Sequence, residues 1–281
     1  MNWAKLARLV VTAAMACMAG LASAADVPAV GPSDLDRGFR LMYNLDFDHA
    51  HQVFAAWQQD HPEDPLAPVG DAAGLLFSEF HRLGVLESQF DDKAFENRKR
   101  LSPDPAVHNR FNSALSMAEN RARARLDKDP KDRDALFAMT LSAGLQADYF
   151  AFIDKSNLSS LHYTKEATSW ANQLLAVDPQ CYDAHLATGV SRYIVGSMSA
   201  PVRWLLRLGG VSGDKKAGID ELKLTAERGR YLAPFARILL AIAYVRDKDN
   251  TSARELLSSL RREFPDNSLF ALEIARLDSI R

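Results

Sequence analysis

The stretch SAPVRWLLRLGGVSGDKK, which ends at Lys216, combines basic side chains with a glycine pair, and such groups bind anions. Arg203 and Arg207 lie one helical turn apart, and we expect Lys215 and Lys216 in the first turn of the next helix. Cations beside a helix N-terminus make a candidate anion site. Alternatively, the lysines point into solvent and the stretch only connects two helices. The glycine spacing does not match that of a P-loop, so we exclude a phosphate loop of that type.

The other reactive residue types form no catalytic or metal-binding pattern. None of the histidine pairs has the four-residue spacing of a helical zinc site. The acidic run DKDPKDRD lacks the glycine of a calcium loop and has Lys131 at a ligand position. Cys181 has His185 four residues further on, but no nucleophile motif surrounds it. We therefore predict a protein that is not an enzyme and that needs no metal or other cofactor.

The N-terminal residues have the features of an export signal. A basic start and a short apolar run are followed by Ala22-Ser23-Ala24, which matches a signal peptidase site. We expect residues 1–24 to be a signal peptide and residues 25–30 to be a linker. This places the mature protein in the periplasm or at the cell envelope. An uncleaved N-terminal anchor is the alternative.

Charge and cysteine content exclude two further classes of protein. Lysine and arginine number 34 against 36 aspartate and glutamate residues, so the chain lacks the basic excess typical of nucleic-acid binding. Removal of residues 1–24 leaves Cys181 as the only cysteine. The mature protein therefore forms no internal disulfide, and packing alone must hold its core together.

A repeated pattern of small and apolar residues organises residues 31–281, the expected folded domain. An alanine is followed four and seven residues later by positions on the same helix face, and twelve residues later by a proline that ends the helix. The pattern begins at Ala50, Ala118, Ala167 and Ala253. Partner helices carry a small residue among apolar ones at Gly38, Ala138, Ala187 and Ala241. Small residues at these positions allow two helices to approach closely.

These paired helices resemble the tetratricopeptide repeat (TPR), a pair of antiparallel helices. The matching residues are Gly38, Ala50, Phe54 and Pro62 in the first copy, and Ala241, Tyr244, Ala253 and Pro265 in the last. The resemblance implies an all-α solenoid of about five hairpins with a final helix from Asp266 to Leu277. The whole chain is similar to exported bacterial TPR proteins of unassigned role, a group that implies no particular activity.

The three middle hairpins are longer than the outer two. The small residues lie twelve apart in the first and last copies, but the intervals Gly70–Ala118, Ala138–Ala167 and Ala187–Ala217 are much wider. All three insertions fall between the two helices of a pair, so we expect them along one edge of the solenoid, which is a candidate binding edge. Their aromatic residues are Phe90, Phe95, Tyr149, Phe150, Phe152 and Trp204.

The first helix of each pair lines the concave surface of a TPR solenoid. In this register that surface includes Phe39, Tyr43, Asp71, Met139, Thr188, Arg192 and Arg246. Apolar, aromatic and arginine side chains together favour a scaffold that binds a protein or peptide partner. The alternative is a lipid- or small-molecule-binding protein, in which the insertions form a lid and the helix with Arg203, Trp204 and Arg207 contacts anionic lipid. An open groove with exposed aromatic residues would favour the scaffold, and an unbroken apolar cavity under the insertions would favour the alternative.

Overall fold

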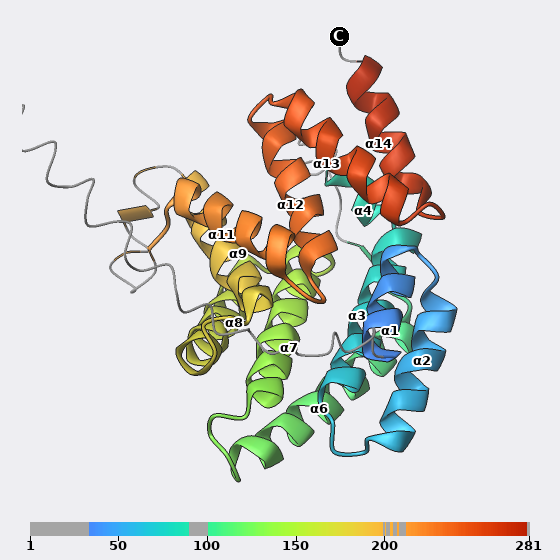
Figure 1. Ribbon diagram of the computed structural model, residues 1–281, viewed down its shortest axis with the longest axis vertical. Coiled ribbons are helices and arrows are strands. Elements are labelled where there is room, and N and C mark those ends of the chain that lie inside the picture. The colour runs from blue at the N-terminus through green and yellow to red at the C-terminus, as the bar shows by residue number, and fades with distance from the viewer. Residues whose placement is uncertain are drawn as a thin grey trace, which may run out of the picture. The chain divides into compact units, whose positions relative to one another are not determined.

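The computed structural model describes residues 34–89, 101–198, 200, 203–204, 207 and 212–279, and every regular element in these ranges is helical. Figure 1 shows the helices following one another along the chain. Their bounds are α1 (Asp34–Tyr43), α2 (Phe47–Asp60), α3 (Leu66–Arg82), α4 (Val85–Ser88), α6 (Pro105–Leu126), α7 (Arg133–Phe152), α8 (Asn157–Val177), α9 (His185–Ser197), α11 (Lys215–Arg228), α12 (Ala233–Arg246), α13 (Asn250–Glu263) and α14 (Ser268–Ser279). The expected signal peptide, residues 1–24, and linker, residues 25–30, lie outside the described ranges.

The helices form a series of stacked hairpins. α1 packs on α2, α3 on α6, α7 on α8, α9 on α11, and α12 on α13. Each hairpin also packs on the next, through α2 and α3, α6 and α7, α8 and α9, and α11 and α12, and α14 packs on α13. The predicted all-α solenoid of TPR-like hairpins is therefore confirmed. Aspartate N-caps begin α2, α6, α7, α11 and α13, where they satisfy free backbone N–H groups.

Phe54 shows why small residues recur at the helix contacts. Its ring is fully buried and lies between α1 and α3. A Cβ atom on Gly38 would lie 2.5 Å from the ring, and one on Gly70 would lie 2.6 Å from it. Both distances are shorter than van der Waals contact, so each glycine makes room for the same phenyl ring.

The second insertion lengthens helices rather than adding a separate segment. α7 has 20 residues and α8 has 21, and only Ile153–Ser156 connects them. The first insertion contributes the short helix α4 and extends α6 to 22 residues. Phe90 and Phe95, and most of the third insertion, lie outside the described residues.

The fourth hairpin has a different close contact from the one expected. Ala187 is only partly buried, whereas Gly189 and Gly218 are buried. A Cβ atom on Gly218 would lie 2.7 Å from the carbonyl oxygen of Gly189 and 2.5 Å from the backbone nitrogen of Tyr193. The backbones of α9 and α11 therefore approach each other at the two glycines. The close contact in α9 is at Gly189, two residues after the predicted Ala187.

The first hairpin contacts the last one within the unit Asp34–Arg281. The guanidinium group of Arg230 donates hydrogen bonds of 2.9 and 2.8 Å to the two carboxylate oxygens of Asp36. At the other end of α1, Arg40 forms a 2.9 Å ion pair with Glu263. The segment before α12 and the C-terminal end of α13 therefore lie against α1.

Candidate functional site

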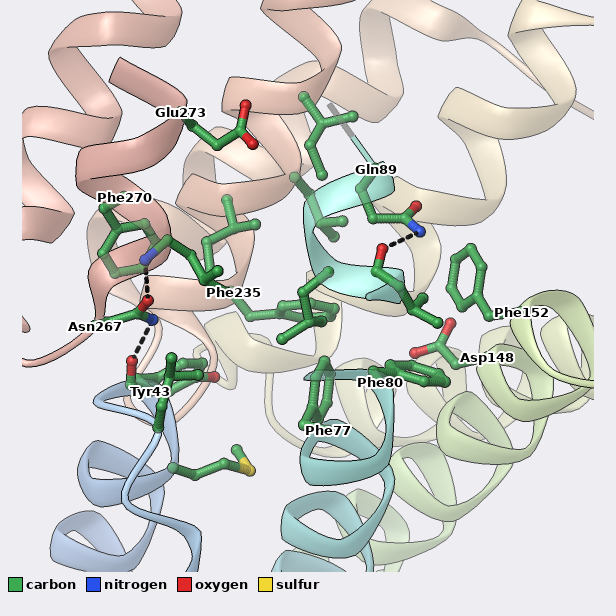
Figure 2. A pocket seen from close by; sticks show the side chains of 18 of the residues that line it. Tyr43, Phe77, Phe80, Gln89, Asp148, Phe152, Phe235, Asn267, Phe270 and Glu273 are labelled. Atoms are coloured by element: carbon green, nitrogen blue, oxygen red, sulfur yellow. Dashed lines mark hydrogen bonds between the residues drawn. The ribbon is translucent and has the colours of Figure 1, made fainter. Parts of the chain in front are cut away.

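An apolar pocket lies where the first helices of four hairpins meet α14. Its walls come from α1, the start of α2, α3, α4, α7, α12 and α14 and from adjoining turns, and its volume is about 120 Å³. Figure 2 shows the side chains that line it. The aromatic lining residues are Tyr43, Phe47, Phe77, Phe80, Phe152, Phe235 and Phe270. The first and last hairpins contact each other, and the pocket is the space that their contact leaves between the first helices of the hairpins.

Four phenylalanine rings form a continuous edge-to-face chain along the pocket. Phe235 of α12 contacts Phe77 of α3, with centroids 5.4 Å apart and planes at 80°. Phe77 contacts Phe80 at 5.7 Å and 81°, and Phe80 contacts Phe152 of α7 at 5.5 Å and 90°. Edge-to-face contacts of this kind stabilise aromatic clusters by about 0.5–1.5 kcal/mol per pair. The four rings connect α12, α3 and α7 and form one apolar wall of the pocket.

Tyr43 and Asn267 close the pocket on the side of α1. The Tyr43 hydroxyl donates a 3.0 Å hydrogen bond to the carbonyl oxygen of Tyr231. Asn267 donates a 2.8 Å hydrogen bond to the Tyr43 carbonyl and accepts one of 3.0 Å from the backbone N–H of Leu269, as Figure 2 shows. These polar groups already have partners within the protein, so their role is structural.

Asp148 supplies a carboxyl group to the pocket wall. It lies one helical turn before Phe152 on α7, and Figure 2 shows its carboxyl group beside Phe80 and Phe152. Burial raises the pKa of Asp148 to about 7, because the apolar surroundings disfavour the charged form. The group is nevertheless not fully enclosed, since part of its surface is accessible to solvent. Both observations fit a carboxyl group that lines a pocket.

Two further polar residues border the pocket. Glu273 of α14 is buried and accepts a 2.9 Å hydrogen bond from Arg276, which balances its charge. Gln89 donates a 3.1 Å hydrogen bond to the Val85 carbonyl and so caps the short helix α4. Glu273 and Gln89 therefore add two polar side chains to a lining that is otherwise mainly apolar.

Comparison with known proteins gives a similarity of fold. No family model and no curated protein matches the chain. Among solved structures, the chain is similar to TTC0263, a thermophilic TPR protein of Thermus thermophilus. The identity is 15% and the TM-score 0.46, over 87% of this chain and 96% of the other.

Three residues predicted to form an open binding surface are instead buried. Phe39 and Met139 lie in the core with only 4% and 2% of their surfaces exposed, and Thr188 is also buried. The Phe39 ring packs against Tyr231, with centroids 4.9 Å apart, so the segment before α12 covers it. The prediction that Phe39 and Met139 are available to a partner is therefore wrong. Tyr43 is also buried, but it borders the pocket.

The predicted arginine and tryptophan positions are exposed, but the structure does not gather them into one site. Arg192 forms a 3.1 Å ion pair with Glu221 of the neighbouring helix, and Arg246 is exposed at the end of α12. Arg203 donates a 3.0 Å hydrogen bond to the Gly196 carbonyl near the end of α9. This contact matches the preference of a cation for a helix C-terminus. Trp204 and Arg207 are exposed.

The predicted anion site at the start of α11 is already occupied by protein groups. Asp214 caps the helix and accepts a 3.1 Å hydrogen bond from the backbone N–H of Ala217. Lys215 forms an ion pair with Asp247, whereas Lys216 is exposed. A carboxylate at the helix N-terminus and another beside Lys215 reduce the positive potential that would attract an external anion.

Cys181 and His185 do not form a nucleophile pair. Burial raises the pKa of the Cys181 thiol to about 11, so the thiol is protonated at neutral pH and is a weak nucleophile. Burial also lowers the pKa of His185. Within the described ranges, no three His, Cys, Asp or Glu side chains are grouped as metal ligands, and no helix there is long and apolar enough to cross a membrane.

Proposed function

We propose that this protein is a non-enzymatic binding protein whose ligand site is the pocket beside the Phe235–Phe77–Phe80–Phe152 chain. The ligand is a small molecule with an apolar part about the size of a phenyl ring or a short alkyl chain. An engineered protein cavity of about 150 Å³ with similar lining binds benzene, and this pocket measures about 120 Å³. The aromatic pocket is the single observation that carries the proposal.

Two observations favour a small ligand over a peptide on the concave face. Phe39 and Met139, which a peptide would have to contact, are covered by the protein itself. In addition, Phe152 and Asp148, near the end of the long helix α7, contribute to the pocket wall. These contributions from α7 support the alternative hypothesis of a small ligand bound near the insertions. TPR-like folds commonly serve as interaction scaffolds, but a fold alone does not assign a function.

A blocking substitution tests the proposal. Leu239 borders the pocket, so Leu239→Trp places an indole in the space where the ligand would lie. The matched control is Leu272→Trp on α14, where the native side chain is 54% exposed. We expect calorimetric titration to detect binding of 1-hexanol to the native protein and the control, but not to Leu239→Trp. Equal binding by both variants, or no binding to the native protein, would contradict the proposal.

We further propose that the protein acts in the periplasm or at the cell envelope. The support is the export signal read from residues 1–24. N-terminal sequencing of the exported protein should begin at Ala25. A retained Met1 would indicate an N-terminal anchor instead.

A second candidate function is contact with a protein partner at the insertion edge. Trp204, in the third insertion, exposes 64% of its surface, and exposed tryptophans are common anchors of interfaces. A photoreactive phenylalanine analogue at position 204 should yield a discrete crosslinked product in intact cells. The same analogue at Met117, an exposed apolar position on α6, is the control. Identical products at both positions would rule out a specific contact at Trp204.

A further inference from the structure

Among the described residues, the charged side chains that line the pocket are both acidic. Asp148 and Glu273 line it, and none of the described lining residues is lysine, arginine or histidine. Glu273 has Arg276 as a partner on its own helix. For the carboxyl group of Asp148, by contrast, the described residues provide neither a hydrogen bond nor an ion pair. The pocket therefore presents an uncompensated carboxyl group next to aromatic rings.

The position of Asp148 relative to the rings defines a two-part site. Its carboxyl group lies beside Phe80 and Phe152, at one end of the chain of four phenylalanine rings (Figure 2). A ligand that reaches Asp148 with a polar group therefore lays its apolar part against the rings. The same rings attract cations through their negative faces. The carboxyl group and the rings thus favour the same kind of polar group, one that carries positive charge.

We propose that the pocket selects small apolar amines, with the ammonium group at the Asp148 carboxylate and the apolar part along Phe80, Phe77 and Phe235. The proposal rests on the proposed function and names its ligand class. An ammonium group donates charge-assisted hydrogen bonds to a carboxylate, and such bonds are stronger where water is excluded. A ligand carboxylate would meet two acidic residues and no cation among the described lining residues, so we expect small carboxylates to bind more weakly than amines.

Compounds that share one alkyl chain separate the charge requirement from simple apolar binding. The native protein is titrated at pH 8 with hexylamine, 1-hexanol and hexanoate, and each heat of binding is measured. Asp148 is mostly ionised at this pH, because burial raises its pKa only to about 7. We expect hexylamine to bind about tenfold more tightly than hexanol, the effect of one charge-assisted contact. Hexanoate should bind more weakly than hexanol.

Asp148→Asn removes the charge but keeps the shape of the side chain. In this variant hexylamine should bind no more tightly than hexanol. Asp220→Asn, an exposed position on α11, changes the net charge equally and should leave the amine preference intact. Thermal unfolding of each variant verifies that it is folded.

The titrations distinguish failure of the amine selectivity from failure of the proposed binding function. If the native protein binds hexanol and hexylamine equally, or if Asp148→Asn keeps the preference, the amine selectivity is wrong and the proposed binding function stands. If none of the three compounds binds, the proposed function fails, and the amine selectivity fails with it.

Discussion

The hydroxyl group of Tyr43, near the start of the folded unit, donates a 3.0 Å hydrogen bond to the carbonyl oxygen of Tyr231, 188 residues further along the chain. Both residues are buried. Burial also raises the pKa of Tyr43, so the hydroxyl remains a donor at any physiological pH. This contact joins α1 to the segment before α12 and forms one side of the pocket.

Loss of this hydroxyl should weaken the contact between the ends of the array. Tyr43→Phe leaves the buried Tyr231 carbonyl without its donor, so we expect a loss of about 1–2 kcal/mol in the free energy of unfolding. Urea denaturation measures the change. Tyr163→Phe, in the partly exposed α8, should have a smaller effect. Equal effects would mean that the hydrogen bond contributes nothing beyond general packing.

Asp148 should make the stability of the protein depend on pH. Its pKa is raised from an ordinary 3.8 to about 7, so between these values the folded state binds more protons than the unfolded state. The contribution of Asp148 to stability therefore falls as pH rises from about 4 to about 7. Asp148→Asn lacks this titration and should be more stable than the native protein at pH 8, by up to about 4 kcal/mol.

Thermal or urea unfolding at several pH values tests this prediction. The difference between Asp148→Asn and the native protein should approach zero near pH 4, where both side chains are neutral. A difference that does not vary with pH would show that Asp148 is not held in its neutral form by burial.

Asp183 should be essential for the start of α12. Its buried carboxylate accepts backbone hydrogen bonds from Arg230, Tyr231 and Leu232, at 3.0, 3.2 and 2.9 Å. Asp183→Ala leaves three N–H groups without an acceptor, and we expect a loss of at least about 2 kcal/mol, the upper end for N-cap substitutions. Asp220→Ala, on the exposed face of α11, is the control and should change the urea midpoint little.

Two glycines in helices should respond in opposite directions to the same substitution. Gly70→Ala places a methyl group 2.6 Å from the buried Phe54 ring and should destabilise the protein by about 1–3 kcal/mol. Gly144, within α7, has no atom within 4 Å of the new methyl group. Gly144→Ala should therefore stabilise the helix by about 0.5–1 kcal/mol. Urea midpoints that shift in the same direction would contradict this account of the repeat contacts.

The sequence was sufficient to predict the hairpins because their signals are local. Small residues such as Ala50 and Ala253 recur in phase with apolar neighbours, and each marks a close helix contact that the structure contains. In the fourth hairpin the pattern did not predict the residue at the helix contact, because alanines and glycines lie within a few residues of each other. There, Ala187 and Gly189 are both small enough for a contact, and only packing distinguishes them.

The pocket could not be predicted in the same way, because it depends on contacts between distant segments. Nothing in the residues around Phe39 indicates that Tyr231 covers its ring. One local signal was available, however. Asp148 is the only charged residue in the apolar run ALFAMTLSAGLQADYFAF, and an isolated acid in such a run often marks a functional position.

The contact between α1 and the segments around α12 and α13 has a consequence for the order of folding. Repeat arrays with only neighbour contacts can fold one hairpin at a time as the chain emerges. Here the side of α1 that carries Tyr43 is covered only when Tyr231 and Asn267 bind to it. The N-terminal hairpin therefore completes its packing only after the C-terminal hairpin has been synthesised and folded. Such distant contacts slow folding and make it cooperative.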